Sequence, residues 1–220
     1  MTTVPDREGP SLDAEARRRE RLVRLLIGGA SNAFGPRRLC QVCAEVTGMS
    51  GAGIMLIGDD TPLRSLCTTN EMSDLVEQLQ YSLDEGPCLD AYRQDRPVIG
   101  PDLVRTGTSR WPAFAPAAIE AGARAVFGFP LRVGAVRLGV LNLCRHQPGP
   151  LNDDQYADAL VMADIAAEAG LVLQASAARS KSPPQRRASP DFHDVAHRPP
   201  AGPPSSSTPS VRPQPAGRSL

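Results

Sequence analysis

Hydrophobic and polar residues follow two different periods along this chain. Apolar residues recur every three or four positions, as on one face of a helix, in four segments: 14–27, 36–46, 71–81 and 152–178. Short apolar runs bounded by turn residues are typical of strands, and they lie at 51–58, 63–69, 97–100, 123–133 and 136–144. The pattern predicts a mixed α/β domain.

Turn and capping residues indicate where several elements begin and end. Gly134 and Ala135 separate the last two strands and predict a two-residue hairpin loop, because glycine suits the first central position. Pro130 predicts a local irregularity in the first of these strands. Asn152 and Gln155 form a capping-box start for the last helix. Shorter elements are predicted at further places: a helix over 88–93 and, after a loop over 101–110, a helix over 111–121.

Each of the four helices named first has an apolar face that predicts which side is buried. The faces are formed by Leu22, Leu25 and Leu26; by Leu39, Val42, Cys43 and Val46; by Leu75, Val76 and Leu79; and by Tyr156, Leu160, Ala163, Ala167, Gly170 and Leu171. We expect each face to pack against the sheet or a neighbouring helix.

Composition divides the chain into three parts. Residues 1–20 are a flexible, Arg-rich segment with a helix start, and 21–178 form one domain with one core. Residues 179–220 contain ten prolines, many serines and no hydrophobic period. Such a segment cannot bury enough apolar surface to offset its chain entropy, so we expect a disordered tail. The formal net charge is zero, yet this tail carries seven basic and two acidic residues. It has few aromatic residues to stack on bases, which favours a solvated tail over a nucleic-acid contact.

The N-terminus and the cysteines predict the compartment. The first 20 residues lack the apolar core of a secretory signal, and no apolar run is long enough to span a membrane. Five cysteines, an odd number, are spread over the domain. We therefore expect a cytoplasmic protein with reduced thiols and no membrane partner.

Several short motifs in a fixed order carry a family resemblance. They are Leu83-Asp84-Glu85-Gly86-Pro87-Cys88-Leu89-Asp90-Ala91, Pro101-Asp102-Leu103, Arg110-Trp111-Pro112-Ala113-Phe114, Phe129-Pro130-Leu131 and Leu138-Gly139-Val140-Leu141. With them, residues 21–178 resemble the sensor half of actinobacterial GAF-ANTAR transcription antitermination regulators. The resemblance implies a GAF/PAS-like fold, with a central, mostly antiparallel sheet and terminal helices packed on one face. It also implies a non-catalytic sensor of a small molecule or of redox state, acting in signal transduction or transcription regulation.

The resemblance extends to ligands and partners. GAF pockets accept cyclic nucleotides, haem, bilins, amino acids or no ligand, so the cofactor is unknown. Homodimers formed through the terminal helices are common in the family. After residue 178 no helical period of an RNA-binding ANTAR domain follows, so we expect no nucleic-acid binding. A stand-alone sensor and a frameshifted remnant of an ANTAR domain both fit this departure.

Six residues are candidates for the ligand pocket, under the segment 82–114 that the resemblance places over it. They are Cys88, Leu89, Asp102, Trp111, Phe127 and Asn142. Cys88 lies in the first turn of a predicted helix, where the helix dipole favours a thiolate, and a packing role at the bend is its alternative. Trp111 lines the pocket or anchors a loop, and Asp102 holds a ligand or caps a turn. Asn142 needs a partner if it is buried, either a ligand or the backbone.

A thiol enzyme is the alternative from another class, because some GAF domains reduce free methionine sulfoxide with loop cysteines. That activity needs an accessible thiol of low pKa near a second one, and Cys88 with Cys67 is the pair to test. Cys40 and Cys43 are interpreted as two core thiols, with redox pairing of the two as the alternative. No histidine falls in the predicted core, so we predict no catalytic residue and no metal ligand. A ligandless GAF module that only dimerises is the third possibility.

Overall fold

A computed structural model describes residues 12–28, 35–58 and 61–181. Its elements, in chain order, are α1 (Leu12–Ile27), α2 (Pro36–Thr47), β1 (Gly51–Gly58), β2 (Thr61–Thr68), α3 (Glu71–Leu83), α4 (Pro87–Gln94), β3 (Val98–Gly100), η1 (Leu103–Gly107), α5 (Thr108–Arg110), α6 (Phe114–Glu120), β4 (Ala125–Val133), β5 (Val136–Arg145) and α7 (Asp153–Lys181). The predicted tail lies outside the described residues, except that α7 continues to Lys181.

The strands form one sheet in the order β2-β1-β5-β4-β3, and every neighbouring pair is antiparallel. β4 and β5 lie in its middle and are joined by a tight turn in which Gly134 has a φ of 58°, as the sequence predicts. Their register shifts between Leu131 and Arg132, beside Pro130, where the irregularity is expected. The predicted α/β fold with a central antiparallel sheet is confirmed.

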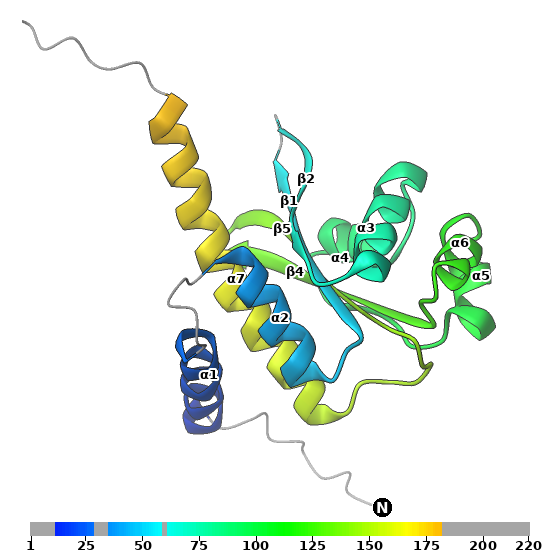
Figure 1. The fold of residues 1–220 in the computed structure, drawn as a ribbon, viewed down its shortest axis with the longest axis horizontal. Coiled ribbons are helices and arrows are strands. Elements are labelled where there is room, and N and C mark those ends of the chain that lie inside the picture. Colours follow the sequence, from blue (N-terminus) through cyan, green and yellow to red (C-terminus); the bar gives the residue numbers. More distant parts are fainter. Residues whose placement is uncertain (1–11, 29–34, 59–60, 182–220) are drawn as a thin grey trace, which may run out of the picture. The chain divides into compact units, whose positions relative to one another are not determined.

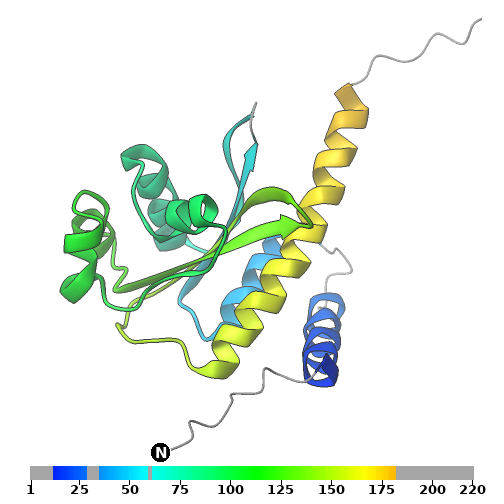
Figure 2. The ribbon, with the colours of Figure 1, turned by 180° about the vertical axis from the view of Figure 1, so that it is seen from behind.

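Helices cover both faces of this sheet (Figure 1). α1, α2 and α7 lie on one face, while α3 to α6 lie on the other, and Figure 2 shows the same division from behind. Side chains alternate between the two faces along each strand. Phe127 and Phe129 of β4 therefore pack with the terminal helices, whereas Val126 packs under the other layer. Two hydrophobic clusters result, one on each face.

α7 packs on the sheet through its small residues rather than through the whole predicted face. Its buried residues include Ala159, Met162, Ala163, Ala166, Ala167 and Gly170. Leu160 and Leu171, and also Leu25 of α1, are each more than a third exposed, so the prediction was wrong at these positions. Tyr156 is similarly exposed, yet its ring packs on Phe129 of β4, as predicted. Small side chains allow closer packing of the helix against its neighbours, and the larger Val161, Met162 and Ile165 are buried between them.

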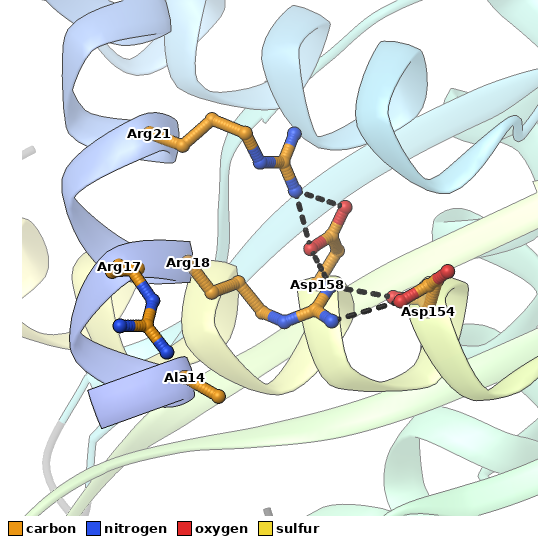
Figure 3. A pocket seen from close by; sticks show the side chains of 6 residues that line it. All are labelled: Ala14, Arg17, Arg18, Arg21, Asp154 and Asp158. Atoms are coloured by element: carbon orange, nitrogen blue, oxygen red, sulfur yellow. Dashed lines mark hydrogen bonds and ion pairs between the residues drawn. The ribbon is translucent and has the colours of Figure 1, made fainter. Parts of the chain in front are cut away.

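The buried carboxylate of Asp158 on α7 holds α1 against the domain (Figure 3). Arg21 of α1 donates to both oxygens of this carboxylate, at 2.7 and 2.8 Å, and Arg18 donates to one of them. The Asp158 side chain is only 7% exposed, and a buried charge is tolerated only when it is paired. Leu22 and Leu26 add apolar contacts, since both are buried in the cluster on this face.

Replacing Asp158 with alanine is expected to loosen α1. The variant should lose about 1–2 kcal/mol of unfolding free energy, because Arg21 loses its carboxylate while Arg18 keeps its 2.9 Å contact with Asp154. Hydrogen exchange of residues 12–27 should become faster. Asp154→Ala is the matched control, since its carboxylate is exposed and its loss should cost under about 0.5 kcal/mol. Unchanged exchange in Asp158→Ala would show that the apolar contacts hold α1 alone.

Between β3 and β4, two elements of the structure differ from the prediction. The segment 101–110, predicted as a loop, contains the helical turns η1 and α5, because the Asp102 side chain accepts hydrogen bonds from Val104 N and Arg105 N. The next helix begins only at Phe114 rather than at 111. The capping alternative for Asp102 is thus the role that the structure gives it.

The described residues contain neither a membrane-spanning helix nor a group of metal ligands. No helix among them is both long enough and apolar enough to cross a membrane. Within the same residues no three His, Cys, Asp or Glu side chains gather where they could bind a metal ion.

Candidate functional site

Asn142 of β5 lies between two glycines on the sheet face covered by α3 and α4. Gly53 of β1 and Gly128 of β4 are its cross-strand neighbours. A β-carbon at Gly53 would overlap the carboxylate of Glu77, and one at Gly128 would lie 2.6 Å from the carbonyl oxygen of Pro87. The absence of these two side chains brings α3 and the start of α4 directly onto the sheet.

α3 places polar residues against this part of the sheet. Its buried residues are Met72, Ser73, Val76, Glu77 and Gln80. Of the predicted face, Val76 is buried and Leu79 packs against the same hydrophobic cluster, as expected, whereas Leu75 is exposed. Four polar or thiol residues therefore meet between α3, α4 and β5, and we call Glu77, Gln80, Cys88 and Asn142 the buried polar cluster.

Glu77 is the acidic member of the cluster and is 2% exposed. Burial raises the pKa of its carboxyl to about 8; the Ser65 side chain opposes this rise and the charge of Asp74 adds to it. Removal from water penalises the charged form, so the carboxyl holds its proton at neutral pH. A protonated carboxyl offers one hydrogen-bond donor together with acceptor oxygens.

Gln80 and Cys88 connect the cluster to the start of α4. Gln80 Oε1 accepts a hydrogen bond of 2.7 Å from the backbone N–H of Cys88, and Gln80 Nε2 donates to the carbonyl of Val76 at 3.3 Å. The Cys88 thiol donates to Asn142 Oδ1 at 3.5 Å. Cys88 thus lies in the first helical turn, as predicted, but burial raises the pKa of its thiol. Loss of hydration outweighs the helix dipole here, which favours the packing role of Cys88 over a thiolate.

Two members of the cluster have buried polar atoms without a hydrogen-bond partner. Neither carboxyl oxygen of Glu77 meets hydrogen-bond geometry with another described group, and neither does Asn142 Nδ2. Buried polar groups in folded proteins are nearly always paired, and each unpaired one costs about 1–3 kcal/mol. The cluster therefore has the hydrogen-bonding groups to hold a small polar molecule on the sheet.

Trp111 packs under α4 to α6 and is not a member of the cluster. Its indole Nε1 donates to Asp90 Oδ2 at 3.1 Å, and the guanidinium of Arg110 lies 4.5 Å from the ring centre. Arg110 also pairs with Asp90 at 3.0 Å. The Glu85 carboxylate accepts from the backbone N–H groups of Ala113 and Phe114. Two of the family motifs are thus bonded to each other, and Trp111 has the anchoring role that was its alternative.

The structure brings together only two of the six predicted pocket residues, Cys88 and Asn142. Phe127 points to the opposite face and packs with the terminal helices. Leu89 is buried but belongs to neither of the two hydrophobic clusters. Asp102 caps η1 and lines a separate surface hollow of about 420 Å³ with Arg105.

The cysteines differ from the prediction that all five are reduced. Cys40 and Cys67 form a disulfide, while Cys43, Cys88 and Cys144 are free and buried. The pairs considered from the sequence, Cys40 with Cys43 and Cys67 with Cys88, are therefore not formed. The packing of β2 on α2 decides the pairing, because it brings Cys67 to Cys40.

Sequence reasoning missed Glu77 and Gln80. Both are polar residues on a helix whose buried side was predicted from apolar residues alone, and a glutamate on a helix is usually solvated. The available signal was Gly53, because a glycine inside a strand indicates close approach of another group. Its partner across the layer could not be read from the sequence.

An antiparallel sheet between a layer of terminal helices and a layer of short helices defines the GAF/PAS-like class of α/β domains. Within this class, the sequence profile described as GAF domain matches residues 37–174, and the chain belongs to that family. No curated protein matches the sequence.

Solved structures share this fold at low sequence identity. A domain of a two-component sensor histidine kinase from Sinorhizobium meliloti is 15% identical with a TM-score of 0.53, covering 67% of this chain and 95% of its own. The GAF domain of an Acinetobacter phosphoenolpyruvate-protein phosphotransferase is 13% identical with a TM-score of 0.55, covering 74% and 97%. Free methionine-R-sulfoxide reductase from Neisseria meningitidis, solved with its substrate, is 12% identical with a TM-score of 0.52, covering 80% and 99%. At these identities the likeness concerns the fold alone.

Proposed function

We propose that this chain is a non-catalytic sensor that binds a small molecule at the buried polar cluster and signals through its terminal helices. The observation that carries the proposal is the set of unpaired buried atoms on Glu77 and Asn142. Apart from the Ser65 side chain, which interacts with the Glu77 carboxyl, no described group uses the donors and acceptors that they offer. The sensor kinase domain among the similar structures agrees with such a role.

The cluster favours an uncharged ligand. Glu77 holds its proton at neutral pH because of its raised pKa, and no basic side chain is buried among the described residues. An anion would therefore meet no opposite charge. An amide, a carboxamide or the edge of a nucleobase matches the donors and acceptors of Glu77 and Asn142. Since Asn142 and Cys88 are fully buried, binding requires α3 and α4 to move away from the sheet.

β5 connects the cluster to the terminal helices. Asn142 belongs to the buried polar cluster and bonds to Cys88. Its neighbours Leu141 and Leu143 face the opposite side of the sheet, where they pack in the hydrophobic cluster that contains Met162 of α7. A shift of β5 on ligand binding therefore changes the packing of α7. Ligand binding acts by favouring one of two such arrangements.

The output follows from the terminal helices. Leu25 on α1 and Leu160 and Leu171 on α7 are apolar and exposed, which supports a homodimer or a partner contact on this side. By its resemblance to the sensor half of GAF-ANTAR regulators, the chain would act in transcription regulation. We propose that this action passes through a protein partner that docks on these helices.

The non-catalytic role is supported by the thiols. A reductase of the methionine sulfoxide type needs an accessible thiolate, yet Cys88 is buried with a raised thiol pKa, and Cys67 is bonded to Cys40. Incubation with free methionine-R-sulfoxide and dithiothreitol should give no methionine. Turnover that is lost in Cys88→Ser would establish the enzyme instead.

A ligand screen tests the sensor. Adenosine, guanosine and nicotinamide are added to the full chain, with cyclic GMP and free amino acids as charged compounds that should not bind, and a binder present at about 100 times its Kd should add about 2.7 kcal/mol of stability. The same compound should slow hydrogen exchange in α7. Asn142→Leu should abolish both effects, whereas Gln78→Leu, which removes an exposed amide from α3, should keep them. Binding that persists in Asn142→Leu would place the ligand elsewhere, and no stabilisation by any compound would favour the ligandless dimerisation module.

A further inference from the structure

The disulfide between Cys40 and Cys67 joins the helix α2 to the edge strand β2. Cys40 is buried in the middle of α2, and Cys67 is half-buried near the end of β2, 27 residues further along the chain. β2 is an edge strand that pairs only with β1. Its register shifts beside the disulfide, because Cys67 pairs with Ile54 and Ser65 with Met55, which leaves Leu66 unpaired.

Both sulfurs lie beside carbonyl groups that suit the reduced state. Cys67 Sγ is 2.9 Å from the carbonyl oxygen of Pro36, and Cys40 Sγ is 3.3 Å from that of Cys67. A disulfide sulfur has no proton to donate, whereas a thiol is a weak hydrogen-bond donor. Reduction would therefore leave each thiol with an acceptor already in place, so the packing is compatible with both redox states.

The other three cysteines are poor partners for thiol–disulfide exchange. Cys43, Cys88 and Cys144 are buried, and burial raises the pKa of each thiol. Thiols without thiolate character or access are inert toward exchange. Cys67 is the cysteine with partial exposure, so an incoming thiolate meets its sulfur first.

The disulfide ties together two walls of an apolar groove. Pro36 and Leu39 of α2, Leu66 of β2, and Ile165 and Ala169 of α7 line this hollow of about 440 Å³. Leu39 and Leu66 are the sequence neighbours of the two bonded cysteines. Breaking the bond therefore frees the β2 wall of the groove from the α2 wall. Both walls adjoin α7, the helix through which we propose that the protein signals.

We propose that Cys40 and Cys67 form a reversible thiol switch, which clamps the edge strand β2 to α2 when oxidised and releases it when reduced. A dithiol supplies the electrons: its thiolate attacks Cys67 Sγ, the S–S bond breaks, and Cys40 leaves as a thiolate that takes up a proton. The second thiol of the reductant resolves the mixed disulfide, so the protein gains two thiols and the reductant becomes a disulfide. The switch itself needs no ligand at the buried polar cluster, and only its signalling consequence rests on the proposed sensor.

Differential alkylation and hydrogen exchange on the full chain test the switch. Under native conditions, dithiothreitol should make Cys40 and Cys67 reactive toward N-ethylmaleimide, with Cys88 and Cys144 unchanged, and oxidised glutathione should reverse the change. Reduction should speed exchange in β2 and α2 by about tenfold, with β4 and β5 unaffected. Cys43→Ser should keep the whole response, and Cys67→Ser should show the fast exchange in either buffer.

Several results would overturn the switch. These are a disulfide that yields to dithiothreitol only after unfolding, a pair that stays reduced in oxidised glutathione, or equal exchange in the two states. If Cys67→Ser does not fold, the wild-type comparison between oxidised and reduced protein still decides. Ligand stabilisation that persists in a chain without redox response would leave the proposed sensor standing.

Discussion

Glu77→Gln is expected to make the protein more stable than the wild type at pH 8, and to change its stability little at pH 4.5. The folded state raises the pKa of Glu77 from 4.5 to about 8 by burial. Between these values the unfolded chain has released the proton that the folded chain still holds, so wild-type stability falls as pH rises. The contribution of the protonated Glu77 to the free energy of unfolding is fully present below pH 4.5. It is lost as the pH rises from 4.5 to 8, and the loss amounts to about 4 kcal/mol.

Urea unfolding of both proteins across this pH range measures the effect. The difference between the two unfolding free energies should grow steadily with pH, because glutamine has the shape of glutamate but does not titrate. Glu71→Gln is the control, since Glu71 lies on the same helix and is exposed; its difference from the wild type should stay nearly constant. If the unfolding free energies of the wild type and of Glu77→Gln changed in parallel with pH, the Glu77 carboxyl would be hydrated or paired in the folded protein.

Trp111→Ala is expected to lower the free energy of unfolding by about 4 kcal/mol, within the range for buried large aromatic residues. The ring is 3% exposed, donates to Asp90 and packs edge-on against Phe114 with 6.5 Å between the ring centroids. Its removal would leave a cavity beneath α4 to α6. Chemical unfolding at neutral pH measures the loss.

Trp111→Phe is the matched variant, because it keeps an aromatic ring and removes the indole N–H. It should lose about 1 kcal/mol from the hydrogen bond and somewhat more from the smaller ring, while Asp90 keeps Arg110 as its partner. If Trp111→Ala were nearly as stable as the wild type yet failed to bind a ligand found in the screen, Trp111 would line the ligand site after all.

The elements of this fold could be predicted because their signals are local. Asn152 and Gln155 cap α7 reciprocally, at 3.1 and 2.8 Å, and a capping box needs only residues three positions apart. The bounds of β1 agree with the apolar run at 51–58. Errors arose where the signal was a helix face, as for Leu75 and Leu160, because several adjacent faces of one helix carry apolar residues.

The candidate site was only half predictable. Asn142 and Cys88 were recognised, one as a polar residue in an apolar strand and the other from its motif. Phe127 was wrong, because a strand residue faces one side or the other of a sheet, and only the neighbouring layers decide which side holds the site. Glu77 has no local sign of burial, since its environment is created by Gly53 on a different element.

The sequence by itself determined the family, the order of the elements and the central hairpin at Gly134, because periodicity, turns and caps act over a few residues. Only the tertiary structure decided that Glu77 is buried beside Asn142 and that Cys40 bonds to Cys67. Both depend on which surfaces meet when α2 and α3 pack on opposite faces of the sheet. Burial and cross-linking are properties of such contacts between distant residues, and these contacts set the pKa of a carboxyl and the partner of a thiol.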